Sequence, residues 1–146
     1  MKSMKTTRIN TAAMLIVGII GIIGSGVALH VARAQGPGIT RQDLQRHDLS
    51  APGREAIQVR VNFAPGAVAE RHSHPGEEIV YAIEGEMEYR LDGKPPVTIK
   101  AGEVLFIPAG TIHSAKNVGS SNAAELATYI VEKGKPLVML GQVSAR

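Results

Sequence analysis

A chain of 146 residues is long enough for one domain with a single core and too short for two. Its net charge of +3 originates at the N-terminus: the first 34 residues carry four of the 16 basic side chains and no acidic one, which leaves 12 basic and 13 acidic side chains in the rest. This nearly neutral body argues against binding to nucleic acid. The absence of cysteine excludes disulfides, thiolate metal sites and cysteine nucleophiles.

The N-terminus has the pattern of an export signal. Three basic residues precede an uncharged, mostly apolar run over residues 11–29, and a small-x-small sequence ends at Ala34. We therefore expect residues 1–34 to be a signal peptide and the protein to be periplasmic or secreted. The alternative is an uncleaved anchor, because the apolar run nearly reaches the roughly 20 residues that cross a bilayer. The protein would then contact the membrane only through this segment.

Residues 35–56 are polar and rich in turn formers, with Gly-Pro-Gly near their start and Ala-Pro-Gly near their end. We interpret them as an N-terminal arm that leads into the domain proper, residues 57–146. His47 lies in this arm, and we expect it to be a solvated surface residue.

From residue 57 onward the chain consists of short apolar pieces separated by turn formers. Pieces of four to seven residues between Gly, Pro, Asn and Asp are typical of antiparallel sandwiches and barrels, and no stretch has the apolar spacing of a helix. The fold class is therefore predicted to be all-β. The expected strands are 57–63, 78–83, 87–91, 97–100, 104–107, 112–116, 126–131 and 137–140.

A first cluster of possible metal ligands begins at His72-Ser73-His74. Side chains at positions i and i+2 of a strand point to the same face, so both imidazoles are expected to project together. Pro75-Gly76 turns the chain, and Glu78 opens the next piece. Glu77 is its rival, but Glu78 shares a face with the small residues Val80 and Ala82, which leave room for a cavity, so we favour Glu78.

His113 follows the turn at 108–110 and supplies a third imidazole. Three histidines and one carboxylate suit a divalent ion of intermediate hardness, which admits Fe, Mn, Ni, Cu or Zn. An octahedral ion with four protein ligands retains positions for water, substrate or dioxygen.

Two longer patterns resemble the two cupin motifs. They are Gly66-x5-His72-x-His74-x3-Glu78-x6-Gly85 and Gly102-x5-Pro108-x-Gly110-x2-His113-x3-Asn117. The resemblance implies a jelly-roll β-barrel (a double-stranded β-helix) that holds one metal ion in its mouth through His72, His74, Glu78 and His113. It also implies a homodimer. We expect the motif glycines to allow positive φ or close backbone approach, and Asn117 to bond backbone groups in a corner.

Proteins that resemble this chain include oxygenases, oxalate-degrading enzymes, isomerases, lyases and non-catalytic binders. Our leading hypothesis is an oxygenase-like metalloenzyme that uses Fe or Mn to bind an oxygen-rich small molecule, with Glu78 as anionic ligand and candidate catalytic residue. The alternatives are a redox-neutral isomerase or lyase and a non-catalytic periplasmic binding protein. Redox-neutral chemistry needs an acid or base near the ion. The candidates are Arg60, Tyr81, Tyr89 and Tyr129. The spacing does not decide whether their side chains point into the barrel or away from it.

Overall fold

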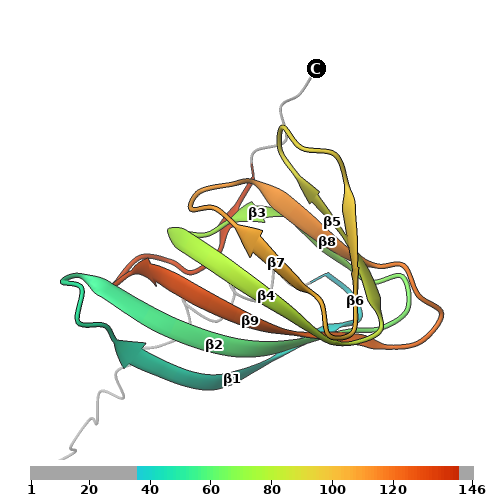
Figure 1. The fold of residues 1–146 in the computed structure, drawn as a ribbon, viewed down its shortest axis with the longest axis horizontal. Coiled ribbons are helices and arrows are strands. Elements are labelled where there is room, and N and C mark those ends of the chain that lie inside the picture. Colours follow the sequence, from blue (N-terminus) through green and yellow to red (C-terminus); the bar gives the residue numbers. More distant parts are fainter. Residues whose placement is uncertain (1–35, 142–146) are drawn as a thin grey trace, which may run out of the picture.

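The computed structural model describes residues 36–141, so the expected signal peptide lies outside the described part of the chain. All regular structure in this range is β, which confirms the predicted fold class (Figure 1). No helix within these residues could cross a membrane. The strands are β1 (Ile39–Asp48), β2 (Arg54–Phe63), β3 (Val68–Ser73), β4 (Gly76–Glu84), β5 (Glu86–Leu91), β6 (Val97–Lys100), β7 (Val104–Ile107), β8 (His113–Asn117), β9 (Ala123–Glu132) and β10 (Met139–Leu140).

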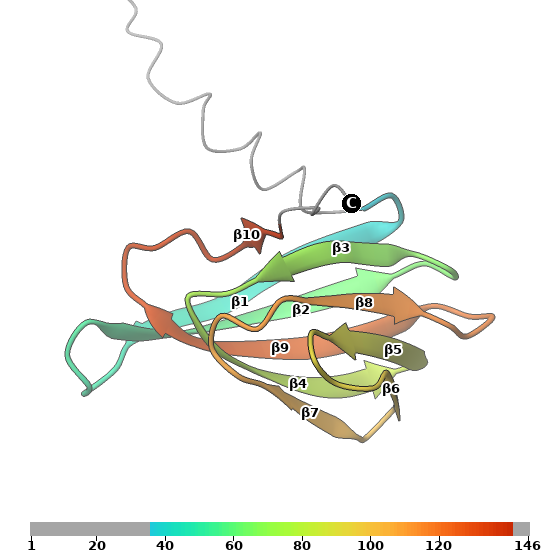
Figure 2. The same ribbon diagram turned by 90° about the horizontal axis from the view of Figure 1, so that it is seen from above.

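The strands form two antiparallel sheets that face each other in the manner of a jelly roll (Figures 1 and 2). One sheet has the order β1-β2-β9-β4-β7, and the other has the order β10-β3-β8-β5-β6. Strands distant in sequence are therefore neighbours, as β2 and β9 are along their whole length. The short β10 pairs with β3 at the edge of the second sheet.

The core lies between the sheets and follows the two-residue period of the strands. Along β2, every second residue from Glu55 to Phe63 is buried, because alternate side chains point to opposite faces. The neighbouring strand β9 buries Ala127, Tyr129 and Val131 in the same way. This alternation carries polar residues as well as apolar ones into the interior, and the functional side chains lie among them.

Strand β1 was not predicted. We expected residues 35–56 to form a polar arm, whereas Ile39–Asp48 pairs with β2 along its length, with one bulge between Asp43 and Gln45. Most of its side chains are exposed because β1 is an edge strand, so its polar composition is compatible with pairing. His47 is exposed, as expected.

Two motif positions have the structural roles that we predicted for them. Gly85 has φ of +78°, and a Cβ there would lie 2.6 Å from the backbone of Ala123, so no other residue fits. The Asn117 side chain donates to the carbonyl oxygens of Phe63, Ala64 and Ser121, and its Oδ1 accepts from the amide of Gly119. Asn117 therefore joins two loops and does not line the pocket.

Candidate metal centre

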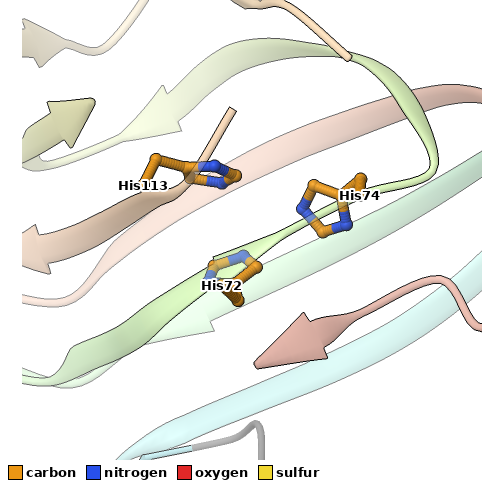
Figure 3. A group of neighbouring side chains, drawn as sticks. All are labelled: His72, His74 and His113. Atoms are coloured by element: carbon orange, nitrogen blue, oxygen red, sulfur yellow. The ribbon is translucent and has the colours of Figure 1, made fainter. Parts of the chain in front are cut away.

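Three strands bring His72, His74, Glu78 and His113 to one place inside the barrel. His72 lies near the end of β3 and His74 directly after it, Glu78 lies in β4, and His113 begins β8. β3 pairs with β8 so that His72 and His113 are directly opposite each other. The three imidazole rings turn toward one another from β3, the turn that follows it and β8 (Figure 3).

The four side chains are close enough to share one ion. One ring nitrogen from each histidine lies within 4.8 Å of the others. Oε2 of Glu78 lies 3.2 Å from Nε2 of His74 and 3.2 Å from Nε2 of His113. All four side chains are buried, so little water competes for these atoms.

The backbone fixes which nitrogen of each ring faces the centre. Nδ1 of His72 contacts the carbonyl oxygen of Glu70 at 2.6 Å, Nδ1 of His74 that of Leu137 at 2.6 Å, and Nδ1 of His113 that of Thr111 at 2.9 Å. A carbonyl oxygen only accepts hydrogen bonds, so each Nδ1 carries the proton and donates it. Each Nε2 is then left with a free lone pair, as in metal-ligating histidines.

Buried atoms at the centre lack hydrogen-bond partners. Within the described residues, His74 Nε2 and Glu78 Oε2 are buried with none, although they lie 3.2 Å apart. In the neutral tautomer that the backbone fixes, both atoms carry lone pairs, so they repel each other unless a proton or a metal ion lies between them. Three imidazole nitrogens and a carboxylate fit a divalent transition metal, which the cluster could therefore hold.

The electrostatics of the cluster also favour a cation. Burial raises the pKa of the Glu78 carboxyl, but His113 and His74, whose Nε2 atoms donate to this carboxyl when the rings are protonated, outweigh burial and hold that pKa well below its usual range. Burial, together with His113 and His74, lowers the pKa of His72 to about 4. Glu78 is thus an anion and His72 a neutral imidazole at pH 7, the protonation states that metal ligands need.

The two faces of β4 separate Glu78 from its rival. Glu78 is buried with Val80 and Ala82, whereas Ile79 and Tyr81 are exposed on the other face. Glu77 shares that outer face and is partly exposed. The expected orientation of this strand is correct.

An enclosed pocket of about 20 Å³ lies against the cluster, which is room for roughly one ion or water molecule. Besides His72, Glu78 and His113, its polar wall is formed by side chains of β1, β5 and β9: Arg41, Tyr89, Glu125 and Tyr129.

Two residues of this wall, Arg41 and Glu125, are not predicted from the sequence. Glu125 shares a face with Ala127 and Tyr129 in an alternating strand, which was a usable signal. Arg41 shares a face with Ile39, but the polar, turn-rich composition of its segment predicts an arm.

Glu125 differs from Glu78 in its neighbours. It accepts a hydrogen bond from the hydroxyl of Tyr89 and has no imidazole within ion-pair distance in the described part of the chain. Burial, and then the charge of Glu78, raises the pKa of Glu125 to about 8. Glu125 is therefore a protonated carboxyl at pH 7.

The four acid or base candidates divide evenly between the inside and the outside of the barrel. Tyr89 and Tyr129 are buried and line the pocket. Tyr81 is 45% exposed on the outer face, and Arg60 bonds Asn62 and Glu84 there. Only the two inner tyrosines are placed to act on a bound molecule.

Comparison with known proteins agrees with this geometry. Residues 59–140 match the cupin domain family. The chain is 38% identical over 89 residues to a germin-like protein (subfamily 2 member 2) of Arabidopsis thaliana, covering 53% of this chain and 39% of that protein. It is 40% identical over 73 residues to the oxalate-binding protein of Thermotoga maritima, covering 49% of this chain and 60% of that one.

A recombinant oxalate oxidase in complex with glycolate has a similar structure, with a TM-score of 0.58 and 26% identity over 70% of this chain and 55% of that one. The chain spans 39% of the length of the germin-like protein and 60% of the length of the oxalate-binding protein. The family match covers more than half of the chain and contains all four clustered side chains. The chain belongs to the cupin family.

Proposed function

We propose that this protein is a small metalloenzyme, oxygenase-like in its chemistry, that acts on an oxygen-rich small molecule. His72, His74, Glu78 and His113 would hold one divalent ion, with Fe or Mn as the leading candidates. Such an ion would supply a Lewis acid for an oxygen-donor substrate and, as Fe or Mn, electrons for reaction with dioxygen.

One observation carries this proposal. Three Nε2 lone pairs and an ionised carboxylate converge on a single buried point, and each ring is fixed by a backbone carbonyl. His74 also packs against Tyr129, with ring centroids 4.6 Å apart, so its ring has little freedom to turn away. A site that only stabilised the fold would be served by a closed shell of protein ligands, whereas the wall of this pocket also contains the polar side chains of Arg41, Tyr89, Glu125 and Tyr129.

The similar proteins support the class of substrate. One is named for binding oxalate, and another is an oxalate oxidase with bound glycolate. Oxalate and glycolate are both small molecules that can chelate a metal ion through their oxygen atoms.

The test combines metal analysis of the purified protein with oxygen uptake against a panel of small acids, diketones and sugars. Oxygen uptake that requires both the metal and one of these molecules is the expected result. Binding without turnover across the panel would instead favour a non-catalytic binding protein.

A redox-neutral lyase or isomerase is the second candidate, and the pocket wall favours it. Tyr129 and the protonated Glu125 lie beside the cluster and could donate or accept a proton during such a reaction. Product formed without oxygen uptake, and lost in Tyr129→Phe while the metal is retained, would establish this chemistry in place of oxygenation.

We also propose that the protein is exported and that residues 1–34 are removed. N-terminal sequencing of periplasmic material should find Gln35 first. Full-length protein in the membrane fraction would favour the anchor.

The outer face of β4 and β7 supports a homodimer. Ile79 pairs with Phe106 and Tyr81 with Val104, and all four apolar side chains are exposed. Ile83, further along β4, is partly buried. A contiguous apolar patch of this kind is typical of an interface. Light scattering at micromolar concentration should give a dimer mass, and Phe106→Lys should give a monomer. A monomeric parent protein would reject this assembly.

A further inference from the structure

Arg41 is the only lysine or arginine that lines the enclosed pocket within the described residues. It lies on β1 directly opposite Val61 of β2, whose side chain is buried in the core. Its Nη2 donates a hydrogen bond of 3.0 Å to the hydroxyl of Tyr129. Since Tyr129 packs against the ring of His74, a single side chain separates the guanidinium from the histidine cluster.

The guanidinium of Arg41 lacks the acidic partner that most arginines here have. Arginines 46, 60, 71 and 90 each form an ion pair with Glu or Asp, whereas Arg41 forms none among residues 36–141. Within the described residues its side chain forms one hydrogen bond, to Tyr129, which leaves most of its N–H donors free there. A partly buried guanidinium with free donors is suited to a carboxylate, which accepts two parallel hydrogen bonds from it.

Arg41 also lines a larger space that leads outward. A groove of about 1010 Å³ runs between β1 and residues 134–139, and Arg41 and Val138 border both this groove and the enclosed pocket. Among the described residues no histidine lines the groove, so a molecule in the groove contacts Arg41 and not the histidine cluster.

The charges of the inner pocket are compatible with an anionic ligand beside Arg41. Glu78 faces the imidazoles, and a divalent ion there would more than offset its charge. Burial is the largest cause that raises the pKa of Glu125, and it favours the neutral carboxyl whether or not an ion offsets the charge of Glu78. Neither carboxyl group would then repel an anion at the guanidinium.

We propose that Arg41 is the specificity-determining residue of this pocket and that it selects small carboxylic acids which enter through the groove beside β1. The carboxylate accepts hydrogen bonds from the guanidinium, while another oxygen of the same molecule faces the cluster of His72, His74, Glu78 and His113. This inference rests on the proposed function, because it assumes a metal in that cluster. It adds the charge that the substrate must carry and the residue that recognises that charge.

Calorimetric titration of the Mn²⁺-loaded protein with glycolate and with its neutral analogue glycolamide tests this inference. Arg41→Gln should weaken glycolate binding by about 10- to 100-fold, the range for loss of a charge-assisted hydrogen bond, and glycolamide binding by less than about threefold. Arg41→Lys, which keeps the charge without the planar fork, should retain part of the affinity. Arg46→Gln is the matched control, since Arg46 borders the groove but not the pocket and is paired with Glu55.

The outcomes separate this inference from the proposed function. Metal content and melting temperature, measured on every variant, should match those of the parent protein. If Arg41→Gln binds glycolate as tightly as the parent, or loses glycolate and glycolamide equally, Arg41 does not select the carboxylate. A parent that holds Mn²⁺ but binds the acid and the amide equally would refute the role of Arg41 and leave the metal site standing. A parent that holds no metal would refute the proposed function itself.

Discussion

Two buried carboxyl groups line the same pocket, yet their surroundings give them opposite charge states. Glu78 faces the imidazoles of His74 and His113, which outweigh its burial and lower its pKa. Glu125 faces the neutral hydroxyl of Tyr89, and burial raises its pKa to about 8. Burial therefore does not decide the charge of a carboxyl in this barrel; the donors beside it do. The surroundings of Glu78 favour a bound cation, whereas the surroundings of Glu125 favour a protonated carboxyl.

The largest expected effect is the loss of metal from the Glu78 region. Removing one imidazole in His113→Ala should weaken metal binding by more than about 100-fold, because changes even to the partners of metal ligands cost 10- to 100-fold. A metal bound only to the folded state at a hundredfold excess over Kd stabilises it by about 2.7 kcal/mol. EDTA should therefore lower the melting temperature of the parent protein by several degrees and leave His113→Ala nearly unchanged.

His47→Ala is the control for this experiment, because His47 is exposed on β1 and far in sequence from the cluster. It should respond to EDTA as the parent does. Equal responses from the His47 and His113 variants would mean that the histidine cluster is not the metal site.

The next effect concerns the proton on Glu125. Its pKa is about 8 in the folded protein and near 4.5 when unfolded, so the folded state binds the proton more tightly. Its contribution to stability is complete below about pH 4.5 and is lost as the pH rises through 8. Glu125→Gln keeps the acceptor for Tyr89 but cannot ionise, so it should not show this loss.

Urea unfolding of EDTA-treated protein at pH 5 and pH 8 measures the difference. Since one pKa unit corresponds to about 1.4 kcal/mol, the stability of the parent should fall by a few kcal/mol more than that of Glu125→Gln. Glu84→Gln, which alters an exposed carboxylate, should follow the parent. Parallel pH profiles for the parent and Glu125→Gln would show that Glu125 does not hold a proton at neutral pH.

The smallest expected effect comes from the partner of Glu125. Tyr89→Phe removes the hydroxyl that donates to this carboxyl, and it should lower the free energy of unfolding by about 1–3 kcal/mol because a buried acceptor is left unpaired. Metal binding should not change. Tyr81→Phe is the matched control on the outer face and should leave stability within about 0.5 kcal/mol of the parent. A loss of metal in Tyr89→Phe would show that metal binding depends on the Tyr89–Glu125 hydrogen bond, which would contradict this prediction.

The sequence predicted the Glu78 region better than the Glu125 region, and the reason is physical. His72, His74 and Glu78 lie within seven residues around one turn, so strand periodicity alone indicates which of their side chains point together. The orientation of Glu78 relative to Glu77 followed from the small residues on its face. The all-β fold followed from short apolar pieces between turn formers.

The wall formed by Arg41 and Tyr129 depends on strand pairing between distant parts of the chain. These residues are 88 positions apart, and only the pairing of β1 with β2 and of β2 with β9 brings them together. An edge strand also has one side open to solvent, so its polar composition resembles that of a loop. The sequence of residues 39–48 therefore gave no clear sign that Arg41 borders a pocket.

The metal stoichiometry of the cluster tests the central claim most directly. Mn²⁺ titrated into EDTA-treated, desalted protein should bind at one ion per chain in the parent and in Glu77→Gln, whose side chain lies on the outer face of β4. Glu78→Gln nearly preserves the volume of the side chain but removes its charge, so it should bind Mn²⁺ at least about 10-fold more weakly. No specific Mn²⁺ binding by the parent, or equal affinity in Glu77→Gln and Glu78→Gln, would contradict the account.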